Sequence, residues 1–233
     1  MTKKSELTKD ELKDLTGKIT ARFMLLPVSL GLITFLPAGT FNYWQVYLYL
    51  TVLVAPMAFV LFYFLKNDPR FLERRTRTKE KEKTQITIQI FFALFFLSGF
   101  IISGLDRRFG WSDIPIYIVI LADAVILLGY MITFIVFKQN SYASRVVEVE
   151  KNQEVITTGL YSIVRHPMYV SVLIMFIPTP IALGSYSGLI PMAMIPFALA
   201  FRILNEENVL TRELPSYKEY CQKTKYRLIP YIW

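Results

Sequence analysis

The only histidine of the chain, His166, lies in a short polar stretch, residues 159–169 (GLYSIVRHPMY), between apolar segments. A second polar group, Arg202 with Glu206 and Glu207, follows the next apolar segments. Lipid cannot hydrogen-bond to backbone or charge, so these side chains need polar partners, water or a ligand beside a membrane. The two groups together predict an active site where the membrane meets the cytoplasm.

The spacing around these residues indicates how they are held. Arg202 and Glu206 are four residues apart and share one face of a helix, whereas Glu207 points about 100° away. An ordinary alternative is a snorkelling arginine paired with a glutamate at a helix end. Pro167 disfavours helical geometry for His166 and suits the first position of the next helix. The free amides of that opening turn would suit the carboxylate of an amino-acid-like cofactor.

Tyrosines surround the same region. Tyr142, Tyr161 and Tyr169 offer apolar faces with polar tips, and such faces can hold a sulfonium or another soft cation by cation–π attraction. Each of them also fits an aromatic belt at the membrane interface. The tyrosines alone therefore do not decide between a binding pocket and interfacial anchoring.

The elements that must position these residues are apolar. The chain has 233 residues, of which 54% are hydrophobic and 19% charged, and the charges are grouped between long apolar runs. This pattern predicts an all-α integral membrane protein with five or six membrane segments. The segments are residues 23–40, 43–65, 86–104, 116–137, 168–183 and 187–204. Prolines interrupt the last two, which predicts a short kinked hairpin that crosses the membrane or only enters it.

Charge predicts the orientation. Apart from Arg107 and Arg108, every lysine and arginine falls on one side of the predicted spans, so both termini and the active site should be cytoplasmic. The net charge of +8 is therefore explained by loops that face anionic lipid, and no nucleic-acid partner is expected. Residues 66–83 form the most basic of these loops and are predicted to be solvated.

The expected organisation is an N-terminal interfacial helix (1–22), four membrane segments with the basic loop 66–83 (23–137), and a catalytic region (138–233). Thr8 and Glu11 predict a capping box at the first helix. Residues 145–150 alternate as an extended segment would. Asp123 lies inside an apolar run, which predicts an interhelical hydrogen bond to Gln89 or a threonine, or contact with a ligand in a wet cavity. Cys221, the single cysteine, cannot form an internal disulfide.

From about residue 138 to the end, the sequence resembles the isoprenylcysteine carboxyl methyltransferase family and its prokaryotic relatives. The matching elements are NSYAS (140–144), GLY (159–161), RHPMY (165–169), the spacing from Arg202 through Glu206 and Glu207 to Leu210, Tyr217 with Tyr220, and the segment from Arg227 to Pro230.

The resemblance implies a pocket for S-adenosylmethionine between the last helices and the C-terminal segment, with a lipophilic acceptor arriving from the membrane. By position, the implied cofactor contacts are Gln153, Glu154, Val155, Ile156, Tyr161, His166, Pro167, Tyr169 and Glu206. Arg202 falls where the family acts on its substrate, so Arg202 and Glu206 are the expected catalytic residues. Gln153 departs from the histidine of the eukaryotic enzymes, and Arg145 or Val146 replaces a glutamine.

The implied reaction is an in-line displacement, in which the protein aligns nucleophile and methyl carbon and excludes water. No metal is required. Arg202 would orient a carboxylate acceptor that is already ionised, whereas an amine would need His166 or Glu206 as a base. A phospholipid N-methyltransferase, an NADPH-dependent sterol or enone reductase, and a non-enzymatic transporter remain alternatives. The expected partners are a lipophilic or lipidated acceptor and membrane lipids, with no obligate protein partner.

Overall fold

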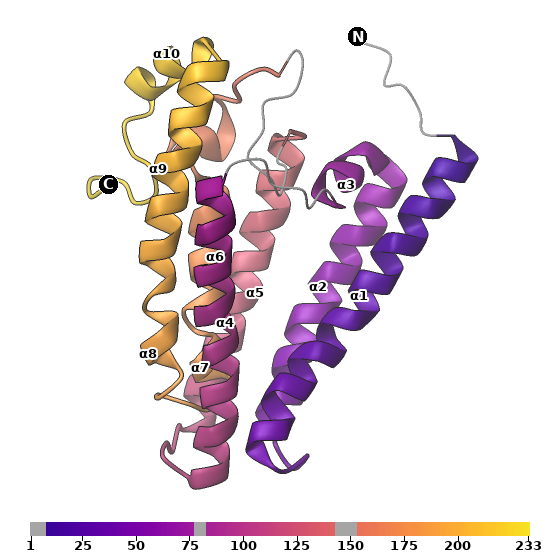
Figure 1. Ribbon diagram of the computed structural model, residues 1–233, viewed down its shortest axis with the longest axis vertical. Helices are drawn as coiled ribbons and strands as arrows, with labels where there is room; N and C mark the ends of the chain where they lie inside the picture. Colours follow the sequence, from indigo (N-terminus) through magenta and orange to yellow (C-terminus); the bar gives the residue numbers. More distant parts are fainter. Residues whose placement is uncertain (1–7, 77–82, 143–152) are drawn as a thin grey trace.

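Long helices run roughly alongside one another through the protein (Figure 1). The computed structural model describes residues 8–76, 83–142 and 153–233, and no strand occurs within these ranges. The helices are α1 (Lys9–Ala38), α2 (Trp44–Asn67), α3 (Pro69–Thr76), α4 (Lys83–Phe109), α5 (Ile116–Gln139), the 3₁₀ turn η1 (Gly159–Ser162), α6 (Pro167–Phe176), α7 (Thr179–Ala182), α8 (Leu189–Met192), α9 (Ile195–Glu213) and α10 (Ser216–Lys223). The predicted all-helical class is confirmed.

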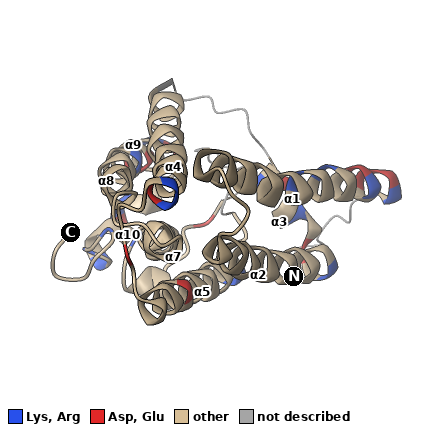
Figure 2. Cartoon of the chain, turned by 90° about the horizontal axis from the view of Figure 1, so that it is seen from below, with Lys and Arg blue, Asp and Glu red and all other residues tan. Residues whose placement is uncertain are grey.

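Five stretches are long and apolar enough to cross a membrane: α1, α2, α4, α5 and the continuous stretch Leu189–Glu213 that contains α8 and α9. A shorter apolar stretch, Pro167–Ala182, contains α6 and α7. Large apolar side chains such as Leu36, Phe62 and Phe201 are exposed on these helices. In Figure 2 most of each long helix is coloured as neither acidic nor basic. The prediction of five to six segments in a multi-pass membrane protein is therefore confirmed.

The helices form two groups. In Figure 1, α1 and α2 run antiparallel beside a bundle that contains α4, α5, α6 and α9. Close contact between α1 and α4 depends on Gly104, where a Cβ atom would lie 2.5 Å from the carbonyl oxygen of Thr34. A similar approach joins α5 to α6, where a Cβ on Gly129 would lie 2.5 Å from Cγ of Met175. These glycines let the helix backbones approach one another, as small residues do in membrane bundles.

The proline-rich hairpin reaches the end of α4 that lies away from the predicted active site. In the turn between α7 and α8, the Ser185 hydroxyl donates to the Asp106 carboxylate at 2.5 Å, and the Tyr186 amide donates to the Ser112 hydroxyl at 3.0 Å. Asp106 lies in the last turn of α4. The tip of the hairpin therefore lies level with the end of α4, which is long enough to cross a membrane.

The structure adds detail to the predicted N-terminal helix and to the basic loop 66–83. The capping box of Thr8 and Glu11 is present, and α1 runs from Lys9 into the first span without a break. Part of the basic loop 66–83 is the helix α3, because Phe71 is buried against Phe64 and Phe137, at ring distances of 4.4 and 4.9 Å. The many charged residues of this segment had led to the prediction of a solvated loop in place of an amphipathic helix.

Asp123 also departs from its prediction. Its side chain is buried in α5, and neither carboxylate oxygen has a hydrogen-bond partner among the described residues. It does not line the pocket described below. The predicted interhelical hydrogen bond is therefore absent from the described part of the chain. The predicted extended segment 145–150 lies outside the described residues.

Candidate active site

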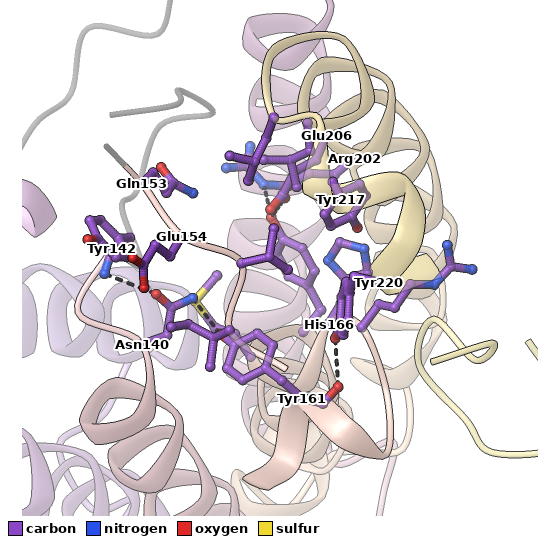
Figure 3. Close-up of a pocket in the computed structure, with 17 residues that line it drawn as sticks. Asn140, Tyr142, Gln153, Glu154, Tyr161, His166, Arg202, Glu206, Tyr217 and Tyr220 are labelled. Atoms are coloured by element: carbon purple, nitrogen blue, oxygen red, sulfur yellow. Dashed lines mark hydrogen bonds between the residues drawn. The ribbon is translucent and has the colours of Figure 1, made fainter. Parts of the chain in front are cut away.

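A pocket lies where α6, α9, α10, η1 and the segment 153–156 meet (Figure 3). It encloses about 860 Å³, including space open to solvent. Polar, aromatic and apolar side chains share the lining: Asn140, Tyr142, Gln153, Glu154, Val155, Ile156, Tyr161, Arg165, His166, Met168, Tyr169, Arg202, Glu206, Leu210, Leu214, Tyr217 and Tyr220. Every predicted site residue except Pro167 is among them.

Pro167 sets the beginning of α6 and does not line the pocket. It occupies the first turn of the helix and is buried, while His166 before it has the non-helical angles φ −125° and ψ 60°. This is the geometry that the His-Pro sequence predicted. The His166 amide donates to the carbonyl of Arg227 at 3.0 Å, which joins the start of α6 to the C-terminal segment. Pro167 therefore shapes the site without lining it.

The imidazole of His166 is held between two side chains. Its ring stacks on that of Tyr169 with centroids 5.7 Å apart, and its Nε2 lies 3.2 Å from Oε1 of Glu207. Glu207 also pairs with Arg165 Nη1 at 3.0 Å and Arg227 Nε at 2.8 Å. One buried carboxylate thus pairs with two guanidinium groups and contacts the imidazole, and it ties α9 to the segment before α6 and to the C-terminal segment.

A chain of hydrogen bonds joins Arg202 to Glu206 through a third residue. Arg202 Nε donates to the Tyr169 hydroxyl at 2.8 Å, and this hydroxyl donates to Glu206 Oε2 at 2.5 Å. Tyr169 comes from α6, whereas the other two come from α9. The shared helix face was predicted from the spacing of four residues. The tyrosine bridge was not predicted, although each of its members was named as a site residue.

The wall opposite α9 comes from the segment before η1 and from η1 itself. Gln153, Glu154, Val155 and Ile156 line the pocket without regular secondary structure. The Tyr161 hydroxyl accepts a hydrogen bond from Asn140 at 2.9 Å, and burial raises the pKa of Tyr161 to about 12. Tyr161 is therefore neutral near pH 7 and cannot act there as a base.

Two residues of the lining, Arg165 and Tyr217, each have a buried polar atom without a hydrogen-bond partner among the described residues, namely Nε and the hydroxyl. Tyr217 is 4% exposed, and its hydroxyl has no hydrogen-bond partner among the described residues. Burial and, after it, the nearby charge of Glu207 raise the pKa of Tyr217, so its proton stays in place. An unpaired hydroxyl in the wall of a pocket is costly unless a ligand or water completes it. Figure 3 places Tyr217 near Arg202, Glu206 and His166.

Several lining residues were missed as site residues. Leu210 and Leu214 continue the four-residue spacing of Arg202 and Glu206, so the same periodicity could have identified them. Tyr217 and Tyr220 were part of the resemblance but had no assigned role. Gln85 does not line the pocket but contacts Arg202, and this contact was also missed. The two residues are 117 positions apart, and no local pattern indicates such a contact.

A comparison with known families points to the same part of the chain. Residues 117–216 match the phospholipid methyltransferase family. A curated protein, the nickel-cobalt-cadmium resistance protein NccN of Alcaligenes xylosoxydans xylosoxydans, is 34% identical over 80 residues, which cover 32% of this chain and 35% of NccN. The matched region thus spans about a third of that relative. The family match supports a methyltransferase activity of the kind found in membrane proteins. The matched residues include α6, α9 and most of the pocket lining.

Proposed function

We propose that the protein is an integral membrane methyltransferase that transfers a methyl group from S-adenosylmethionine to a lipophilic acceptor. The observation that carries this proposal is the Arg202–Tyr169–Glu206 chain in a pocket at the end of membrane-spanning helices. The phospholipid methyltransferase match over residues 117–216 supports the reaction type. The one-sided distribution of lysine and arginine supports a cytoplasmic site and cytoplasmic termini.

The residues present fit S-adenosylmethionine. The unpaired Tyr217 hydroxyl calls for a polar ligand atom, and tyrosine faces suit a sulfonium. Glu206 and Glu154 suit hydroxyl or ammonium groups of such a ligand, and the opening turn of α6 beside His166 suits a carboxylate. When bound, the cofactor supplies a methyl group on a positively charged sulfur. Gln153, Val155, Ile156 and Tyr161 would complete its enclosure.

Arg202 is the residue proposed to meet the acceptor. Its neighbours on α9, Phe201 and Leu204, are 65% and 41% exposed, so the guanidinium lies next to a lipid-facing surface. An arginine in this place can orient an acidic or polar headgroup while the rest of the acceptor stays in lipid. A carboxylate acceptor, as in methyl esterification of a prenylcysteine, would then be ionised without help.

A phospholipid amine is the second candidate acceptor, and the family match favours it. An ammonium must lose a proton before it can attack a methyl group. Glu206 and His166 line the pocket and are the groups that could accept this proton. A carboxylate acceptor thus needs only to be oriented by Arg202, whereas an amine acceptor also needs Glu206 or His166 as a base.

Methyl transfer can be tested with the purified protein in lipid vesicles. S-adenosylmethionine carrying a labelled methyl group is added with either phosphatidylethanolamine or an S-prenylcysteine, and the lipids are analysed by mass spectrometry. We expect a labelled product that depends on Arg202, so Arg202→Ala should lower turnover by at least about a hundredfold while affinity for S-adenosylhomocysteine changes only a few fold.

The control is Arg212→Ala, an exposed arginine on the same helix that does not line the pocket, and it should keep full activity. Equal loss of transfer and cofactor affinity in Arg202→Ala would assign Arg202 to cofactor binding or folding instead. A thermal shift with NADPH but none with S-adenosylhomocysteine would favour a reductase. Transport of an added lipid without any product would favour a transporter.

A further inference from the structure

Gln85 contacts Arg202 from another helix. It lies in the first turn of α4, its side chain is completely buried, and its Oε1 accepts a hydrogen bond from Arg202 Nη1 at 2.9 Å. Its Nε2 donates to the carbonyl of Arg202 at 3.2 Å and to Oδ1 of Asn205 at 2.7 Å. Gln85 thus contacts both the guanidinium and the backbone of the same arginine.

This arrangement limits the positions that the Arg202 side chain can adopt. Arginine is a long side chain with considerable rotamer freedom, and that freedom must be lost before it can orient an acceptor. Tyr169 holds Nε from one side and Gln85 holds Nη1 from another, so the plane of the guanidinium is fixed by groups from α6 and α4. Hydrogen bonds from the amide of Gln85 to α9 fix the amide itself.

We propose that Gln85 is a positioning residue that sets the orientation of Arg202 toward the acceptor. The proposal rests on the proposed function and extends it to a helix outside the region that matches the methyltransferase family, residues 117–216. The N-terminal half of the chain then contributes to acceptor specificity as well as to membrane anchoring. Gln85 does not line the pocket, so it acts through Arg202 and not by touching the ligands.

The chemistry of the amide separates positioning from simple packing. Gln85→Leu keeps the approximate size but removes all three hydrogen bonds. Gln85→Glu loses the bond to the Arg202 carbonyl, but it keeps an acceptor for Arg202 Nη1 and makes that bond charge-assisted, while the Asn205 amide can turn to donate to the new carboxylate. A positioning role therefore predicts strong loss in the leucine variant and retention in the glutamate variant. A packing role predicts similar behaviour of both.

The experiment measures methyl transfer with the same labelled cofactor and the same two acceptor probes, in vesicles, for wild type and variants. Because a hydrogen bond to a charged group is lost, Gln85→Leu should lower kcat/KM for the acceptor by about tenfold to a hundredfold, with affinity for S-adenosylhomocysteine within about threefold. Gln85→Glu should stay within about threefold of wild type in both. Thr84→Val, at the exposed neighbouring position, is the matched control and should leave both values unchanged.

A double-mutant cycle with Arg202→Lys supplies the decisive comparison. If Gln85 acts through Arg202, adding Gln85→Leu to Arg202→Lys should lower the residual rate by less than about threefold. Full additivity of the two losses, or equal activity of the leucine and glutamate variants, would overturn the inference while leaving the proposed function in place. A wild-type protein that transfers no methyl group would instead overturn the proposed function, and the inference with it.

Discussion

Two tyrosine hydroxyls on α10 have opposite surroundings although their residues are one turn apart. The Tyr220 hydroxyl donates to the carbonyl of Tyr161 at 2.7 Å, whereas the Tyr217 hydroxyl has no partner among the described residues. Both side chains are buried. The first hydroxyl is therefore satisfied by the fold itself, whereas the second is buried without a partner in a residue that lines the pocket.

Phenylalanine substitutions should separate these roles. Tyr217→Phe should leave the midpoint of thermal unfolding unchanged or raise it, because it removes an unpaired buried hydroxyl, and should lower affinity for S-adenosylhomocysteine by about fivefold. Burial raises the pKa of Tyr217 above the free value of about 10, so this loss should be the same at about pH 6 and pH 9. Titration calorimetry and a thermal-shift assay measure both quantities.

Tyr220→Phe is the comparison for that prediction. It should lower the free energy of unfolding by about 1 kcal/mol, because the bond to Tyr161 is lost. If Tyr217→Phe destabilised the protein as much as Tyr220→Phe and left affinity unchanged, the hydroxyl of Tyr217 would have a structural partner and no role toward a ligand.

At the scale of elements, the local signals in the sequence were sufficient for most helices. Hydrophobic runs located the spans, Thr8 and Glu11 located the start of α1, and Pro167 located the start of α6. Each of these signals depends on neighbours within a few residues. The helix α3 was missed because its two buried residues, Phe71 and Leu72, are surrounded by charge in the sequence, and only their packing on other helices explains them.

The contact between α1 and α4 provides a test of helix packing. Gly104→Ala would place a Cβ atom 2.5 Å from a backbone oxygen of α1, which cannot move without shifting the helix. We expect a loss of about 1–3 kcal/mol in unfolding free energy, seen as a lower midpoint in thermal unfolding. Gly17→Ala on α1 is the control, because nothing lies within 4 Å of its Cβ and alanine favours a helix. Similar midpoints for the two variants would show that the helices do not approach as described.

At the scale of the whole molecule, the site joins parts that are distant in the sequence. Most pocket residues of the C-terminal region were named because their motifs resemble those of a known family, and the structure brings all of these except Pro167 around one pocket. The bond from Gln85 to Arg202 and the bridge through Tyr169 depend on how separate helices pack. No local spacing determines that packing, which is why the sequence indicated the members of the site but not the bonds between them.

The central claim is that this pocket binds the methyl donor, and titration calorimetry with S-adenosylhomocysteine tests it most directly. We predict saturable binding to the wild-type protein, at least about tenfold weaker binding in Glu206→Ala and His166→Ala, and unchanged binding in Glu213→Ala, an exposed residue at the end of α9 that does not line the pocket. Absence of binding heat in the wild type, or equal affinity in all three variants, would contradict the account.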